Sequence, residues 1–143
     1  MRDILQYFDT ITGIVEHGAV ESLDVAYDPR AMTLGNVSGV LYLQDGSRLE
    51  FRELVAIRSR RPAKLRYRYQ YVRAGEALFR YDNVGHHPGV SSHPHHKHVG
   101  RHILPATEPS LAQVLEEAVR LMQESRNGKP RPAKRRRQTT RKK

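Results

Sequence analysis

The chain has 143 residues, which suits a single folded domain with a short appendage, because a core of this size seldom supports two domains. Its formal net charge of +10 is uneven, since residues 126–143 hold ten of the 25 basic residues and none of the 15 acidic ones. The absence of cysteine excludes disulfides, a thiol nucleophile and a thiolate zinc site, so any metal would need His, Asp or Glu ligands.

The first residues predict a cellular location and a short helix. They carry an acid at position 3 and no long apolar run, so they lack the pattern of a secretion signal or a membrane span. We therefore expect a cytoplasmic protein that does not associate with membranes. The spacing of Ile4, Leu5 and Phe8 predicts a short helix over residues 2–8.

Alternating apolar residues predict the first three strands. Residues 21–27 and 36–43 place apolar side chains at every second position, which is typical of a half-buried strand. The Asp45-Gly46 pair then predicts a tight hairpin, because both residue types tolerate a positive φ. The third strand, residues 49–57, slips from this period at Leu54, so we expect a bulge there.

The fourth predicted strand, residues 64–73, has two unlike faces. The apolar face holds Leu65, Tyr67, Tyr69 and Tyr71, and the mainly basic face holds Lys64, Arg66, Arg68, Gln70 and Val72. We expect the tyrosines to belong to the core, because their neighbours on that face are apolar. After a turn at residues 74–76, a fifth strand over residues 77–81 leads to Asp82 and the histidines.

The last predicted element is a helix over Leu111–Glu124. Ser110 and Gln113 form a capping box at its start. A single apolar stripe follows, made of Leu111, Val114, Leu115, Ala118 and Met122. Asn127-Gly128 and Pro130 end the helix, which we expect to pack on the sheet.

The expected fold class is therefore α+β, with an about five-stranded, mainly antiparallel sheet and the C-terminal helix packed on one face. Residues 1–125 make up this domain. Residues 126–143 have too little apolar surface to fold alone, so we expect a disordered basic tail.

Six of the eight histidines fall between Phe79 and His98, and we look for function there first. Pro88, Gly89 and Pro94 exclude a regular helix, so the segment is predicted to be a loop with a short extended piece. Histidine exchanges a proton near neutral pH and is the commonest metal ligand, which leaves more than one chemistry open.

One interpretation is an acid/base site that acts on RNA without a cofactor. One imidazole takes the proton of a ribose 2′-hydroxyl, a second protonates the leaving oxygen, and Lys97 or Arg80 stabilises charge on the phosphate. Asp82 would hold one ring in the required tautomer. The candidate catalytic residues are Asp82, His86, His95, His96, Lys97 and His98.

Two other interpretations of the histidines remain open. On an extended backbone His93 and His95 project to one side and His96 and His98 to the other, so a metal could find two ligands on either side. Asp82, His86 or His87 would complete its coordination. Alternatively, the rings are solvated or hydrogen-bonded to backbone in a proline-rich loop and have a structural role only.

Basic residues predict contacts with the phosphates of a nucleic acid. The candidates are Arg66 and Arg68 on the fourth strand, Arg80 on the fifth, and Lys134, Arg135, Arg136 and Arg137 in the tail. A solvated strand face and a solubilising tail are the plainer explanations for the same residues.

Several short motifs together resemble the TumE family of toxins. They are Arg80-Tyr-Asp-Asn83, His86-His87-Pro88, Pro94-His-His-Lys-His-Val-Gly100, Pro105 and the Glu108-Pro-Ser-Leu start of the last helix. The resemblance covers about residues 20–124. It implies the toxin half of a bacterial toxin–antitoxin pair, neutralised by a helix-turn-helix antitoxin encoded beside it.

The residues and the resemblance together favour a toxin that inhibits growth by acting on RNA, with metal-independent cleavage by the histidines as one mechanism. The alternatives are a protein that binds RNA or the ribosome without cutting, and a metal-dependent hydrolase that uses the histidine cluster.

Overall fold

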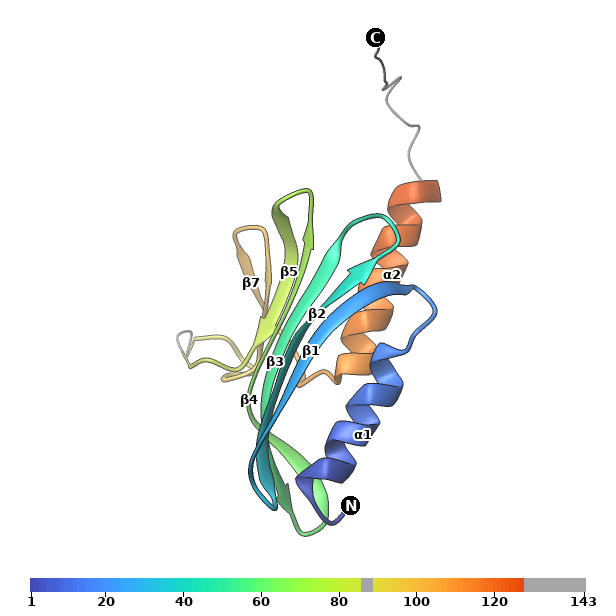
Figure 1. Cartoon of the computed structure of the whole chain (residues 1–143). Coiled ribbons are helices and arrows are strands. Elements are labelled where there is room, and N and C mark those ends of the chain that lie inside the picture. Colours follow the sequence, from blue (N-terminus) through green and yellow to red (C-terminus); the bar gives the residue numbers. More distant parts are fainter. Residues whose placement is uncertain (86–88, 128–143) are drawn as a thin grey trace.

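The computed structural model describes residues 1–85 and 89–127, and these form two helices and a seven-stranded antiparallel sheet (Figure 1). In chain order the elements are α1 (Ile4–Val15), β1 (Val20–Ala31), β2 (Leu34–Leu43), β3 (Arg48–Arg58), β4 (Arg61–Arg73), β5 (Glu76–Asp82), β6 (His96–Val99), β7 (His102–Pro105) and α2 (Leu111–Asn127). Each strand pairs with the next along the chain, so the sheet is a meander. The α+β class and the C-terminal helix are confirmed, whereas the predicted number of five strands is wrong.

The two additional strands, β6 and β7, lie where we expected a loop with a short extended piece. Each has four residues, which is too short to show the alternation that identifies a strand in a sequence. Gly100 adopts a φ of +60° between them, a conformation that favours glycine, and lets β7 fold back on β6. The meander thus brings part of the histidine-rich segment beside β5.

The first helix is longer than the predicted residues 2–8. The side chain of Asp3 accepts a hydrogen bond of 3.0 Å from the backbone N–H of Gln6, which caps the start of α1. The buried stripe that begins at Ile4 then continues through Ile11 to Val15, one turn after another. This stripe packs on β1, β2 and β3.

The C-terminal helix begins as predicted. Ser110 Oγ accepts from the backbone N–H of Gln113 at 3.1 Å, and Gln113 Oε1 accepts from the backbone N–H of Ser110 at 2.9 Å, which confirms the capping box. The predicted apolar stripe is buried against the same core as α1, and the helix continues to Asn127. Both described helices therefore cover one face of the sheet, and we call the other face the open face.

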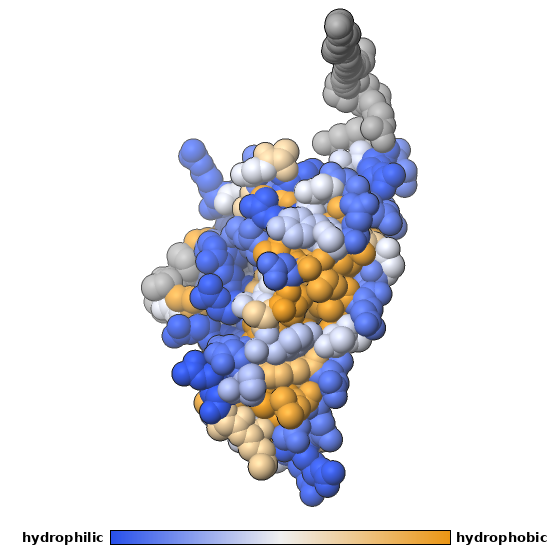
Figure 2. All heavy atoms as spheres, in the orientation of Figure 1, coloured by the Kyte–Doolittle hydropathy of each residue, from blue (hydrophilic) through white to orange (hydrophobic). Residues whose placement is uncertain are grey.

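Tyrosines of β4 form the centre of the core between the sheet and the helices. Tyr67, Tyr69 and Tyr71 are each at most 1% exposed, which confirms their predicted place. Burying a large aromatic side chain stabilises a fold by about 1.5–3 kcal/mol. On the side seen in Figure 2, apolar residues gather over α1 and β1, where Leu5 and Leu23 are exposed.

A bulge lies in β4 at Leu65, not in β3 at Leu54 as predicted. The register passes from Leu54 opposite Arg66 to Val55 opposite Lys64, so Leu65 is the extra residue. As a result Leu65 is partly exposed, and Lys64 turns to the helix-covered face rather than the basic one. The predicted faces of these two residues are therefore wrong.

The helix-covered face also buries an acid, Glu53. Glu53 follows Leu49 and Phe51 at every second position of β3, where the alternation leads one to expect an apolar residue. Glu53 is 0% exposed and accepts hydrogen bonds from the hydroxyls of Tyr7 and Tyr69, and Lys64 Nζ lies 3.8 Å from its Oε2. Burial, reinforced by Glu53, raises the pKa of both tyrosines. Burial also lowers the pKa of Lys64, against the opposing effect of Glu53. This network joins α1 to β3 and β4.

Neither of the two described helices is long and apolar enough to cross a membrane.

Candidate active site on the open face

The strand register places polar residues side by side in two rows across the open face. Opposed residues of antiparallel strands project to the same face, so each row can be followed from strand to strand. One row is Ser38, Arg52, Arg68, Asp82 and His96, and the next is Val40, Glu50, Gln70, Arg80 and His98. The histidines of β6 therefore lie beside charged residues from β5, with arginines of β3 and β4 farther along the rows.

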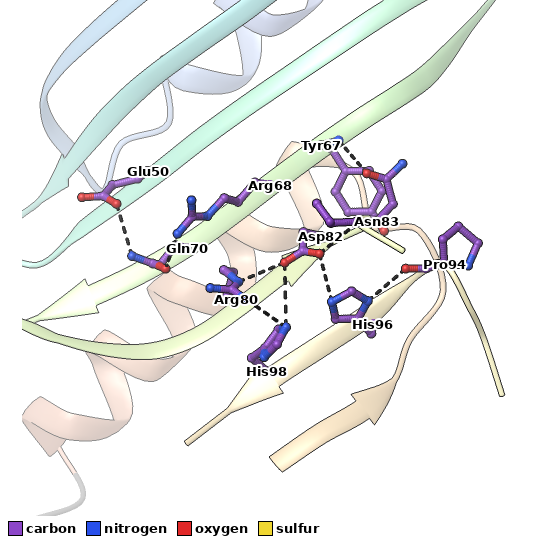
Figure 3. A network of polar contacts seen from close by, with 11 residues as sticks. Glu50, Tyr67, Arg68, Gln70, Arg80, Asp82, Asn83, Pro94, His96 and His98 are labelled. Carbon is purple, nitrogen blue, oxygen red and sulfur yellow. Dashed lines mark hydrogen bonds and ion pairs between the residues drawn. The ribbon is translucent and has the colours of Figure 1, made fainter. Parts of the chain in front are cut away.

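Asp82, the last residue of β5, is the centre of a polar network (Figure 3). It is only 3% exposed, yet its carboxylate has two hydrogen-bond donors and a close histidine. Oδ1 accepts from the backbone N–H of Val84 at 3.0 Å and lies 2.9 Å from His96 Nε2, and Oδ2 accepts from Arg80 Nε at 2.9 Å. A buried carboxylate with these partners is held in one position.

His96 has an acceptor at each of its two ring nitrogens. Nε2 faces the Asp82 carboxylate, and Nδ1 lies 2.9 Å from the backbone carbonyl of Pro94. Carboxylates and carbonyls accept hydrogen bonds but cannot donate them, so these partners restrict the orientation of the ring. With 2% exposure, His96 is suited to positioning Asp82 and less suited to exchanging protons with a ligand.

Arg80 links the buried carboxylate to the more exposed His98. Its Nη2 lies 3.0 Å from His98 Nε2, and this nitrogen is 3.9 Å from Asp82 Oδ2. Since a guanidinium is always a donor, His98 Nε2 must accept, and the proton of the neutral ring is then on Nδ1. The side chain of His98 is 21% exposed, so it is the histidine of this network that a ligand can reach more easily.

Lys97 lies on the opposite side of β6 from these two histidines, because it alternates with them along the strand. Its Nζ donates to Glu117 Oε2 of α2 at 2.6 Å and lies 4.9 Å from the centre of the Tyr81 ring. Partial burial acts to lower the pKa of Lys97, but hydrogen bonds with Glu117 and Tyr81 outweigh it and raise the pKa. The structure therefore does not bring Lys97 together with Asp82.

Another predicted catalytic residue, His95, is not part of the network. His95 Nδ1 lies 2.9 Å from the hydroxyl of Tyr67, a residue whose side chain belongs to the core. Predicted His86 lies outside the residues that the structure describes. Of the six candidates, Asp82, His96 and His98 are therefore the ones that the described structure brings together.

The predicted phosphate-binding residues of the strands lie on the open face. Arg66 and Arg68 are exposed on β4, and Arg80 is partly buried in the network. The predicted tail residues Lys134, Arg135, Arg136 and Arg137 lie outside the described residues.

Asp82, His96 and His98 also form a candidate metal-binding group. One ligand atom from each lies within 4.8 Å of the others. These residue types suit Zn²⁺ or a similar ion, but two of their atoms, Asp82 Oδ2 and His98 Nε2, are the partners of the Arg80 guanidinium. Binding an ion at both of these atoms would require Arg80 to move.

A second set of polar contacts on β3 and β4 joins the predicted Arg68 to residues that we did not predict as site residues. Arg68 Nη2 donates to Gln70 Oε1 at 3.2 Å, and Gln70 Nε2 donates to Glu50 Oε1 at 3.3 Å (Figure 3). Arg52 lies opposite Arg68 on the neighbouring strand. The polar alternation of β3 at positions 48, 50 and 52 was the available signal, but only the register places Glu50 and Arg52 in the same rows as the histidines.

A comparison with models of protein families agrees with the motifs around this site. Searches of curated proteins and of solved structures found no match. The sequence model of the family described as Toxin TumE matches residues 10–126, which is most of the chain and includes every residue of the network. The chain therefore belongs to the TumE family of toxins.

Proposed function

We propose that this TumE-family toxin inhibits growth by acting on RNA bound across the open face, and that His98 and Arg80 carry the chemistry. The observation that supports this most is the Arg80 guanidinium, which joins a buried carboxylate to a partly exposed histidine. Arg52 and Arg66, both exposed, have no hydrogen-bond or ion-pair partner among residues 1–85 and 89–127, and remain able to contact phosphates.

In the proposed reaction an RNA phosphate competes with His98 for the Nη2 side of Arg80. When Arg80 Nη2 donates its hydrogen bond to the phosphate and no longer to His98, the lone pair of His98 Nε2 can accept the proton of the 2′-hydroxyl. The 2′-oxygen then attacks the adjacent phosphorus, the bond to the 5′-oxygen breaks, and a 2′,3′-cyclic phosphate forms. The 5′-oxygen leaves as a hydroxyl after it takes a proton from water, and His98 returns its proton to the solvent. Arg80 stabilises the charge that grows on the phosphate oxygens.

Asp82 and His96 are positioning residues in this scheme. Asp82 holds Arg80 through Nε, so the guanidinium can engage a phosphate without leaving the site. His96 holds the other oxygen of Asp82 and is itself held by the Pro94 carbonyl. This arrangement restricts the movement of the groups that would meet the substrate.

A second candidate is a metal-dependent hydrolase, which the closeness of Asp82, His96 and His98 favours. We rank it second because Arg80 occupies two of the ligand atoms with a positive charge. A cation bound there would have to overcome the repulsion of the guanidinium as well as displace it.

We also propose that the antitoxin partner implied by the family is a helix-turn-helix protein encoded beside this chain, and that both act in the cytoplasm. Co-expression of the neighbouring gene should restore growth and yield a complex that copurifies. Continued arrest in the presence of a folded, expressed neighbour would contradict this assignment.

Growth arrest on induction tests the role of the network. Replacing a proton-transfer group typically costs about 10²–10⁴ in rate, so His98→Ala should relieve the arrest. His102→Ala is the matched control, because His102 is an exposed residue of β7 outside the network. Circular dichroism should show both variants folded. Full toxicity of folded His98→Ala would contradict the catalytic role and favour an RNA- or ribosome-binding toxin that does not cut.

A further inference from the structure

The open face has a polar hollow beside the proposed reaction centre. It has a volume of about 380 Å³ and is lined by side chains of four neighbouring strands, β1 to β4. Its hydrogen-bonding groups include Ser38, Glu50, Arg52, Arg68 and Gln70. The proposed reaction does not use this hollow.

Glu50 supplies acceptors to the hollow. An ionised carboxylate has about four acceptor positions. Arg48 Nε takes one on Oε2 at 2.7 Å and Gln70 Nε2 takes one on Oε1 at 3.3 Å. One position on each oxygen therefore remains for a ligand with two adjacent donors. Of the other charged side chains in this hollow, Arg52 and Arg68 are donors, and Asp24 of β1, two strands from Glu50, is a further acceptor.

We infer that the hollow binds a guanine base of single-stranded RNA. Guanine has two adjacent donors, N1–H and the N2 amino group, which match both oxygens of a carboxylate, and its O6 and N7 accept from arginine. Adenine, cytosine and uracil each have an acceptor within the corresponding edge, which would face the Glu50 carboxylate unfavourably. Single-stranded RNA is commonly recognised through such base edges.

The place of the hollow suits a base next to the reacting phosphate. Gln70, on its edge, is directly opposite Arg80, and Glu50 is one strand farther along the same row. Neighbouring strands are about 4.8 Å apart, so roughly 10 Å separates the backbone of Glu50 from that of Arg80. A nucleotide whose phosphate contacts Arg80 can therefore reach the hollow with its own base or an adjoining one. The inference rests on the proposed action on RNA and adds a preferred base.

Binding of short oligonucleotides to the full chain tests the inference. The probes are 2′-O-methyl pentanucleotides of sequence UUGUU, UUAUU, UUCUU and UUUUU, which lack the free 2′-hydroxyl and cannot be cut by the proposed route. A bidentate contact to a base discriminates by about 5- to 140-fold, so UUGUU should bind that much more tightly than the others. Replacing its guanine with hypoxanthine removes the N2 amino group and should lose most of this preference.

Glu50→Gln should bring the affinity for UUGUU to within about threefold of that for UUAUU, because an amide no longer offers two acceptors. Glu124→Gln removes the same charge from an exposed position on α2 and should leave the preference unchanged. Equal affinity of the wild type for the four probes, or a guanine preference that survives Glu50→Gln, would overturn the inference. Neither of these two binding results would contradict cleavage by His98. Conversely, full toxicity of His98→Ala would refute cleavage, and the base preference could still be measured by binding.

Discussion

Replacement of Asp82 by asparagine should weaken the fold as well as the site, because the carboxylate is buried and accepts hydrogen bonds on both oxygens. Asparagine is nearly the same size but has one acceptor oxygen and an NH₂ group. Whichever way the amide turns, the NH₂ faces a donor, either Arg80 Nε or the backbone N–H of Val84.

The expected loss follows from these hydrogen bonds. A hydrogen bond to a charged group contributes about 1.5–3 kcal/mol net. If the amide oxygen keeps the contacts of Oδ1 in weaker form and Arg80 loses its partner at Oδ2, the free energy of unfolding should fall by about 2–4 kcal/mol. With a urea dependence of about 2 kcal/mol per molar, the unfolding midpoint should fall by roughly 1–2 M.

Urea unfolding followed by circular dichroism at neutral pH measures this loss. Asp9→Asn is the control, because Asp9 is exposed on α1 and should change the free energy of unfolding by less than about 0.5 kcal/mol. If Asp82→Asn were as stable as Asp9→Asn, the contacts of the Asp82 carboxylate would not hold the network together, and the positioning role of Asp82 would be refuted.

Two further predictions concern the core and the tail. Burial raises the pKa of Tyr69 above 10.0, so the folded state keeps the phenol proton at a pH where the unfolded state loses it. The contribution of Tyr69 to the free energy of unfolding is therefore fully present below about pH 10 and falls above it by about 1.4 kcal/mol per pH unit. Tyr69→Phe should flatten this fall in urea titrations at about pH 10.5–11.5. An unchanged alkaline slope would contradict the buried network. Deletion of residues 126–143 removes ten positive charges. The slope of log affinity for single-stranded RNA against log salt should then become shallower by about 0.7 for each phosphate that the tail neutralises in the full chain. An identical slope would show that the tail does not bind RNA.

The sequence predicted those elements whose signals are local. The tyrosines of β4 alternate over a long strand, and the capping box of α2 lies within four residues. The predicted hairpin turn has its positive φ at Gly46 and not at Asp45. In each case the information is contained in one short segment. These features agree with the structure for that reason.

The missed features depend on contacts between distant segments. β6 and β7 are too short to show a period, and they are strands because β5 provides an edge to pair with. Glu53 was not expected in the core, since its partner hydroxyls and Lys64 come from α1 and β4. Nor could Glu50 be placed near the site without the register that aligns β3, β4 and β5.

The histidine segment shows the same division. Its composition directed attention to His96, His98 and Asp82, which the structure brings together, because these residue types exchange protons and bind phosphates or metals. An extended backbone also predicted that His96 and His98 share a side. Only the structure separates them into a buried ring between two acceptors and a partly exposed ring that accepts from Arg80.

The central claim is that the toxin cuts RNA through His98 and Arg80 without a metal, and the ends of the products test it most directly. Purified full chain should be incubated with a single-stranded RNA in excess EDTA, with His98→Ala and the control His102→Ala in parallel. The account predicts 5′ products that end in 2′,3′-cyclic phosphate for the wild type and His102→Ala, with a rate about 10²–10⁴ lower for His98→Ala. Cleavage that stops in EDTA and returns with added zinc or manganese, or equal cleavage by His98→Ala, would contradict it.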